Sequence, residues 1–219
     1  MGNRLNEYRK IVNKMYKKAI REVKTTQYTE NTVSDAASKI LMVENKTQIP
    51  VPIINICKKI GFVVFMQDLP GDICGYIAVD GELKEKFGSD KLISVDKNES
   101  NKRRRFTVAH ELGHYLFEFN PNNQIQFYNA FEEPHVTSDR PNEKLANRFA
   151  AELLMPKNEF VSEAKNAYRI HKNSSEMLYE VVQILSDKFL VPPKAVERRL
   201  KEELRDELCD TMPELFNLS

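Results

Sequence analysis

Apolar residues recur with a helical period through most of this 219-residue chain. Where apolar positions follow one another at i, i+3, i+4 and i+7, one side of a helix is apolar and is expected to face a core. Capping residues and the Pro and Gly breaks then mark where each segment begins and ends. The pattern predicts helices at residues 3–24, 32–43, 52–60, 101–117, 139–155, 157–168, 175–189 and 192–208.

Three short runs have a different composition, rich in β-branched and aromatic residues, which is typical of strands. They cover residues 62–66, 73–79 and 92–95. Short connections join them, so the economical arrangement is a small three-stranded antiparallel sheet. The predicted fold class is therefore α+β, predominantly helical with one small sheet.

Composition narrows the class of protein. Charged residues make up 30% of the chain and apolar residues 41%, and no apolar run approaches the roughly 18 residues that a membrane span requires. The first 24 residues are basic and lack an apolar run, so we expect no secretory signal, no membrane association and a cytoplasmic protein. With 33 basic and 32 acidic side chains, the chain as a whole offers no electrostatic surface for direct nucleic-acid binding.

The cysteines add no chemistry of their own. Cys57, Cys74 and Cys209 are odd in number, widely separated and without C-x-x-C spacing. This spacing argues against a disulfide framework and against a thiolate metal site. We expect buried or free thiols.

The predicted helix at 101–117, which Ser100 or Asn98 can cap, carries an H-E-x-x-H pattern at His110, Glu111 and His114. Residues four apart project from one face of a helix, so both imidazoles can converge on one ion. Zinc is the natural candidate, and a Glu beside the first His is placed to deprotonate water at an open zinc site. Two such histidines could also be a surface pair or hydrogen-bonded core groups. The apolar residues around them favour a buried helix, where histidines need partners.

A catalytic zinc site needs a third protein ligand, and the helix at 139–155 offers two candidates. Glu143 begins a stripe that shares one face of this helix with Ala146, Asn147, Ala150 and Leu154. The small residues would let this helix pack closely on the H-E-x-x-H helix, which favours Glu143. Glu152 is the rival acid, although it lies on a different face.

The segments on either side of the motif raise two further questions. The first turn of the helix contains Arg103, Arg104 and Arg105, whose positive charges oppose the helix dipole. We expect a structural salt bridge, rather than an incoming peptide, to compensate these charges.

The composition of residues 118–140 predicts a long loop, and loops of that length are generally functional or mobile. His135 in this loop is a possible transition-state stabiliser, although an ordinary exposed histidine is the simpler interpretation.

Residues 182–200 superficially resemble a DNA-reading helix-turn-helix and include Arg198 and Arg199. Two amphipathic helices joined by a short turn give the same pattern, and the acidic residues that follow would repel phosphates. We therefore expect packing helices here.

The sequence closely resembles the ImmA/IrrE family of metallopeptidases in three motifs: RFTVAHELGH at residues 105–114, EKLANRFA at 143–150 and LLMP at 153–156. The resemblance covers roughly residues 50–200, since the strand-like runs and the closing helices also look like the family's pattern. It suggests an N-terminal helical segment at 1–48, a metallopeptidase domain with C-terminal helices at 49–208 and a tail at 209–219.

This resemblance implies a gluzincin-like core in which His110, His114 and Glu143 hold Zn2+ and Glu111 is the catalytic base. Members of the family cleave or bind a cognate helix-turn-helix repressor or antitoxin, often in mobile elements or stress responses. Two classes of function therefore stay open. The first is a zinc endopeptidase acting on such a partner, and the second is a non-proteolytic, toxin-like or regulatory protein that only binds it. An intact Glu111 favours the enzyme, because a structural metal site needs no base.

Overall fold

A computed structural model describes residues 2–24, 26–29, 32–44, 48–118 and 141–216 of the chain. The first half contains the sheet and five helices: α1 (Gly2–Lys24), α2 (Val33–Met42), α3 (Ile53–Ile60), β1 (Val63–Gln67), β2 (Gly75–Val79), α4 (Leu83–Phe87), β3 (Lys91–Asp96) and α5 (Asn101–Phe117). The described residues after Glu118 are mostly helical: α6 (Pro141–Leu154), α7 (Lys157–His171), α8 (Met177–Phe189), α9 (Pro193–Arg198) and α10 (Arg205–Leu208). The fold is thus α+β and mostly helical, as predicted.

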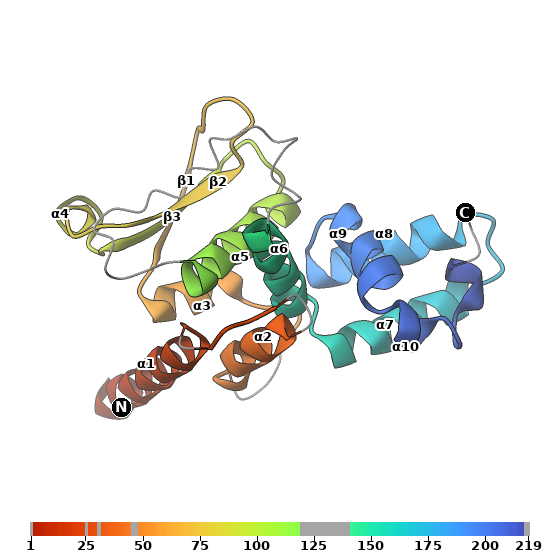
Figure 1. The fold of residues 1–219 in the computed structure, drawn as a ribbon, viewed down its shortest axis with the longest axis horizontal. Helices are drawn as coiled ribbons and strands as arrows, with labels where there is room; N and C mark the ends of the chain where they lie inside the picture. Colours follow the sequence, from red (N-terminus) through yellow and green to blue (C-terminus); the bar gives the residue numbers. More distant parts are fainter. Residues whose placement is uncertain (1, 25, 30–31, 45–47, 119–140, 217–219) are drawn as a thin grey trace.

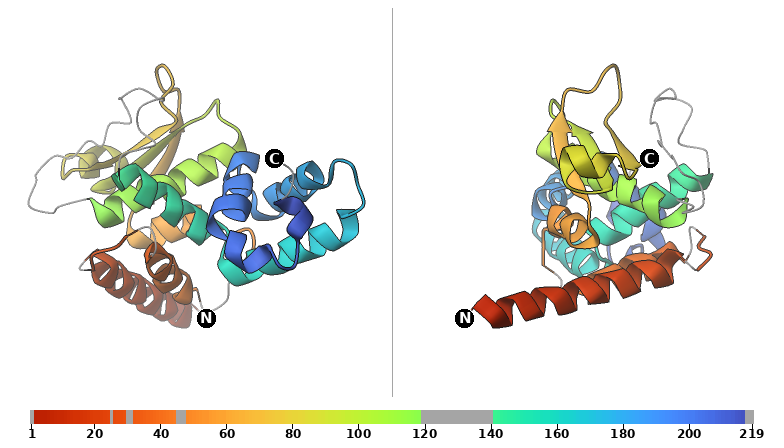
Figure 2. Two further views of the ribbon diagram at one scale, coloured as in Figure 1. Left: turned by 45° about the vertical axis from the view of Figure 1, so that its right-hand side comes forward. Right: turned by 90° about the vertical axis from the view of Figure 1, so that its left-hand side faces the viewer.

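The long helix α5 lies at the centre of the molecule. The sheet covers one side of it, whereas α1 and α2 lie on the opposite side, and α6 crosses beside it (Figures 1 and 2). Helices α7 to α10 gather at the end of the molecule away from the sheet (Figure 1). In the described part of the chain, no helix is both long enough and apolar enough to cross a membrane.

The sheet is mixed, and the prediction of a purely antiparallel sheet is wrong. Its strand order is β1-β3-β2, with β3 parallel to β1 and antiparallel to β2. The connection from β1 to β2 spans the width of one strand, so that β3 enters between them. The four consecutive buried residues of β3, from Leu92 to Val95, show that both faces of this central strand are covered.

Local signals place several helix ends where the sequence predicts them. Gly61 ends α3 in the left-handed conformation at φ 104°, which glycine adopts without steric cost. The Ser100 side chain accepts a hydrogen bond from the Arg103 amide and caps α5. Two features were not predicted: the short helix α4, and a π-helical turn at Arg199–Glu203 that interrupts the helix expected at 192–208.

The described cysteines agree with the expectation of free thiols. None forms a disulfide; Cys57 is buried, and Cys74 and Cys209 are partly exposed.

Helices α5 and α6 approach each other unusually closely, and this approach positions the candidate site. A Cβ atom added to Gly113 would lie 2.9 Å from the Ala146 Cα atom and 3.3 Å from its Cβ atom. Ala146 and Ala150 are fully buried in the same contact. Small residues at these positions allow the two helix backbones to meet, as the alanine stripe predicts.

The N-terminal helices share the central core. Tyr16 and Val23 of α1 and Ile40 of α2 are fully buried and belong to one hydrophobic cluster with the residues of α5 and α6. Helix α2 packs directly on α6. Residues upstream of the sheet therefore help to hold α6 in place.

The close approach of α5 and α6 makes Gly113 sensitive to added volume. We expect Gly113→Ala to lower the free energy of unfolding by about 1–3 kcal/mol, because the new methyl group would push α6 away from α5. Chemical denaturation measures this change. Gly81→Ala is the control, since nothing lies within 4 Å of its Cβ position, and a change within about 0.5 kcal/mol is expected there. Equal stability of the two variants would contradict this account of the helix contact.

Candidate metal centre

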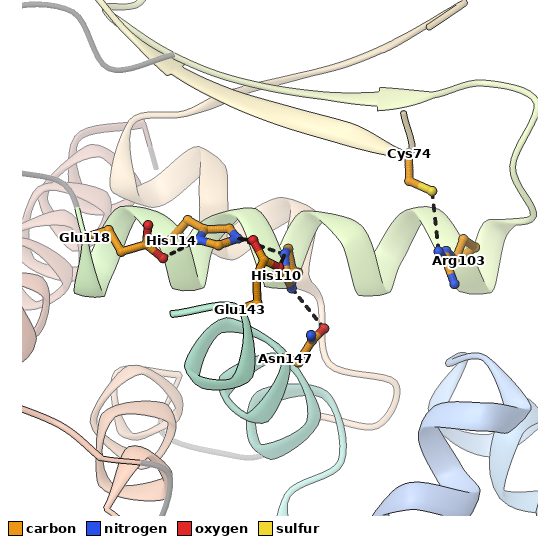
Figure 3. Close-up of polar contacts among 7 residues, drawn as sticks. All are labelled: Cys74, Arg103, His110, His114, Glu118, Glu143 and Asn147. Carbon is orange, nitrogen blue, oxygen red and sulfur yellow. Dashed lines mark hydrogen bonds and ion pairs between the residues drawn. The ribbon is translucent and has the colours of Figure 1, made fainter. Parts of the chain in front are cut away.

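The side chains of His110 and His114 on α5 and Glu143 on α6 converge between the two helices (Figure 3). The two Nε2 atoms are 2.8 Å apart. Each lies 3.3 Å from an oxygen of Glu143, His110 from Oε2 and His114 from Oε1. One ligand atom from each residue therefore falls within 4.8 Å of the others, which is close enough to share one metal ion.

The other nitrogen of each ring is held by a hydrogen-bond acceptor. His110 Nδ1 lies 3.0 Å from Asn147 Oδ1, and His114 Nδ1 lies 2.5 Å from Glu118 Oε1 (Figure 3). Each Nδ1–H donates to its acceptor, which leaves the Nε2 atoms pointing toward each other and toward Glu143. In many proteins, a hydrogen-bond acceptor on the nitrogen that does not bind the metal orients the histidine ring in this way. Two imidazoles and a carboxylate form a donor set that suits zinc, so the residues present fit the ion.

The charges around His114 show that protons and metal compete for this site. Burial lowers the pKa of His114, but its hydrogen bonds to Glu118 and Glu143 outweigh this effect and raise the pKa to about 10. Burial raises the pKa of Glu143, but its hydrogen bonds to both histidines hold it well below its usual range. The three groups thus form a compact charged cluster, and a metal ion must displace a proton from it.

Glu111 lies beside this cluster and is buried, with 4% of its surface exposed. Burial raises its pKa, the charges of His110 and His114 oppose this, and the nearby Glu143 and Glu118 carboxylates add to it. A raised pKa makes Glu111 a stronger base than an exposed glutamate. Its position and its environment both suit proton transfer.

The structure separates the two acids considered for the third ligand. Glu152 lies in a buried ion pair, with its Oε2 atom 2.7 Å from the fully buried Arg199 guanidinium. Its other oxygen lies 3.0 Å from Arg148. Arg199 also donates to the Met155 carbonyl. Glu152 thus joins α6 to the C-terminal helices, and Arg199 is not exposed to bind DNA.

Two of the three arginines before the motif bond to backbone carbonyls and not, as predicted, to acidic side chains. Arg104 donates to the Lys97 and Glu99 carbonyls, and Arg105 donates to the Val51 and Leu190 carbonyls. The expected structural salt bridge is absent among the described residues. Carbonyl groups at the ends of neighbouring elements accept hydrogen bonds from the guanidinium groups instead. These bonds fix the start of α5 to three separate segments.

Sequence reasoning placed Asn147 on the same face as Glu143 but gave it no role, and it missed Glu118. Each lies four positions after a predicted ligand, Asn147 after Glu143 and Glu118 after His114. Because residues four apart on a helix are neighbours, that spacing could have identified them. His135 and the long loop around it lie outside the described residues, so the role considered for His135 stays a prediction.

We expect the purified protein to carry about one zinc ion per chain, and the two acids to differ in their effect on it. Glu143→Gln should lower the zinc content measured by elemental analysis, because a carboxylate ligand is lost. Glu152→Gln should keep the zinc in the folded protein but lower its stability, by up to about 3–5 kcal/mol, since Arg199 would lose its buried partner. The reverse pattern of zinc loss would assign the ligand to Glu152.

Substitution of Asn147 tests whether the hydrogen-bond acceptor of the His110 ring contributes to zinc affinity. Asn147→Ala should weaken zinc binding about 10–100-fold, because the His110 ring loses the acceptor that orients it. Asn147→Asp keeps an acceptor oxygen and should restore most of the affinity. Competition with a zinc-binding dye measures both, with Asn142→Ala on the exposed surface of α6 as the control. Unchanged affinity in Asn147→Ala would remove this residue from the site.

Comparison with known families is consistent with this geometry. The model of the IrrE N-terminal-like domain, a peptidase family designated Peptidase M78, matches residues 57–201. No curated protein matches the chain. The matched range includes α5 and α6, with all the residues of the candidate site, but excludes α1 and α2. The chain therefore belongs to the Peptidase M78 family of metallopeptidases, the IrrE N-terminal-like family.

Proposed function

We propose that this metallopeptidase is a zinc-dependent endopeptidase with Glu111 as its general base. The observation that carries the proposal is the convergence of His110, His114 and Glu143 beside a buried glutamate. A purely structural zinc site is usually closed by four protein ligands. Among the described residues the cluster offers three, which leaves room for a reacting molecule.

His110, His114 and Glu143 would hold the zinc ion, which when bound polarises the scissile carbonyl and makes water easier to deprotonate. Asn147 and Glu118 keep the two imidazoles oriented for this task. Glu111 accepts the proton of the attacking water and delivers it to the leaving amine. The raised pKa of Glu111 suits it to both transfers.

The structure also suggests how a substrate would lie. The strand β2 pairs on one edge with β3, and it has no strand on its other edge in the described part of the sheet. Gly75 at the start of β2 packs against Thr107, one helical turn before His110: a Cβ atom on Gly75 would lie 2.5 Å from the Thr107 side chain. An extended peptide that pairs with this edge would run past the metal centre.

For the substrate we propose a cognate helix-turn-helix repressor or antitoxin in the cytoplasm, cut in a linker or a frayed helix. The support is the family, together with the requirement for an extended peptide, which a folded helical protein does not provide. A cut there would relieve transcriptional repression or release a toxin partner. Slow action on unrelated folded proteins follows from the same requirement.

The base can be separated from the metal by one substitution. We expect Glu111→Gln to keep its zinc while its turnover falls at least ~100-fold, because the amide keeps the shape but cannot accept the proton. Zinc analysis and a cleavage assay measure the two properties on one sample. Glu197→Gln, on the exposed surface of α9, should change neither. Full activity of Glu111→Gln would leave the mechanism without support.

The cleavage assay offers the zinc-loaded protein a helix-turn-helix protein encoded beside its gene, with casein as an unrelated substrate. Mass spectrometry of the products should show a discrete cut in the first, absent with Glu111→Gln. Tight binding of that protein without a cut, over a range of metal concentrations, would instead favour the non-proteolytic function.

A further inference from the structure

Arg103 differs from the two arginines that follow it in α5. Arg104 and Arg105 each donate to two backbone carbonyls. The Arg103 side chain is exposed, and among the described residues its guanidinium has one acceptor, the Cys74 sulfur, which lies 3.4 Å from Nη2. A guanidinium has five N–H donors and a thiol is only a weak acceptor. Most of the hydrogen-bonding capacity of Arg103 is therefore not used by the described residues.

The charge of Arg103 also lacks a carboxylate in direct contact within the described part of the chain. Glu99 contacts the same thiol, with its Oε1 atom 3.6 Å from the Cys74 sulfur, but it forms no ion pair with Arg103. A positive charge in the first turn of a helix opposes the helix dipole, so a counter-charge there would be favourable. For Arg103, the arrangement favours the incoming peptide over the internal salt bridge.

Arg103 lies on the same face of α5 as the two histidines of the metal centre. Spacings of four, three and four positions place four residues in one row along this helix: Arg103, Thr107, His110 and His114. Figure 3 shows Arg103 and the two histidines following one another along α5. The His110 side chain is 17% exposed and that of Glu143 is 26% exposed, so solvent reaches the metal centre.

The start of β2 lies beside the same row. Cys74, directly before β2, contacts Arg103, and Gly75, the first residue of β2, packs against Thr107. The other edge of β2 has no strand partner in the described sheet. An extended peptide that pairs with this edge and reaches the metal centre would pass Arg103.

The geometry of a helix and of an extended chain gives the distance along such a peptide. Arg103 is seven positions before His110, which corresponds to about 10 Å along the helix axis, or about 13 Å to the midpoint of the two histidines. An extended peptide advances about 3.3 Å per residue, so these distances correspond to roughly three or four residues.

We propose that Arg103 selects substrates that carry Asp or Glu three or four residues from the scissile bond. This inference rests on the proposed endopeptidase function, and it defines the substrate class as an extended acidic segment. The planar guanidinium can donate two parallel hydrogen bonds to one carboxylate, a geometry that Asn, Gln or Lys on the substrate cannot match.

Peptide hydroxamates test the proposal without a cleavage step, because the hydroxamate binds zinc and holds one end of the peptide at the metal centre. Two sets of analogues continue from the hydroxamate in either chain direction. Each set carries Glu, Gln or Lys at the third or the fourth residue, because alternate side chains of an extended peptide point to opposite sides. The peptide ends are capped, so the tested side chain carries the charge.

Calorimetry with the zinc-loaded full chain measures the affinities. In at least one series the Glu analogue should bind about three- to fivefold more tightly than the Gln analogue, the scale of a partly exposed ion pair, and the Lys analogue should bind more weakly. Arg103→Glu should invert the order in that same series, so that the Lys analogue binds most tightly. Arg169→Glu is the matched control on exposed α7, and it should keep the order of the unmodified chain.

The outcomes separate this inference from the function on which it rests. Equal binding of the Glu, Gln and Lys analogues in every series would overturn the role of Arg103 while leaving the metal centre intact. An order that Arg103→Glu does not change, or that Arg169→Glu changes equally, would overturn it as well. Absence of binding by any analogue would contradict the open zinc site itself, and the inference would fail with it.

Thermal melting checks the folding of the variants. Arg103→Glu should melt close to the unmodified chain, because the side chain is exposed and an acidic residue suits the first turn of a helix. If this variant does not fold, Arg103→Gln decides the question. The Glu and Gln analogues should then bind it equally, and a retained preference for Glu would overturn the proposal.

Discussion

The contact between α5 and α6 is the constraint on which the candidate site depends. A metal centre with two ligands on one helix and one on another needs both backbones at a fixed short distance. Gly113 and Ala146 provide that distance, because any larger side chain would separate the helices. Glu143 then reaches both imidazoles from the opposite side. The packing of this interface therefore decides whether the three ligands can bind one ion.

The surrounding structure resists movement of either helix. At its start, α5 is fixed through arginine bonds to backbone carbonyls and through Lys102, which donates to Ser186 and pairs with Asp187 on α8. α2 packs on α6, and α6 is joined to the C-terminal helices through Glu152 and Arg199. A site supported in this way can hold a charged cluster whose groups would otherwise separate in water.

Local sequence patterns predicted much of this arrangement. They failed where contacts between segments far apart in the sequence determine the structure. The helical periods, the Gly61 and Ser100 caps and the H-E-x-x-H spacing all concern residues within one or two turns. Strand order instead depends on where β3 enters the sheet, which the composition of a strand does not encode. The sequence placed Arg199 in a pair of packing helices but did not reveal its buried ion pair, because its partner Glu152 lies far away along the chain. The acceptors of Arg105, which lie before α3 and after α8, could not be inferred for the same reason.

The buried pair of Glu152 and Arg199 has a consequence for the order of events during protein synthesis. The ribosome makes the complete motif, from His110 to Glu143, well before it makes Arg199. Until Arg199 emerges, Glu152 lacks the partner that fixes α6 to the C-terminal helices and pairs only with Arg148 of its own helix among the described residues. Translation adds roughly 5–20 residues per second, which leaves an interval of seconds in which the ligands exist but their helices are not firmly docked. The support that holds α6 in place is therefore complete only after residue 199 has been made, long after the last of the three ligands.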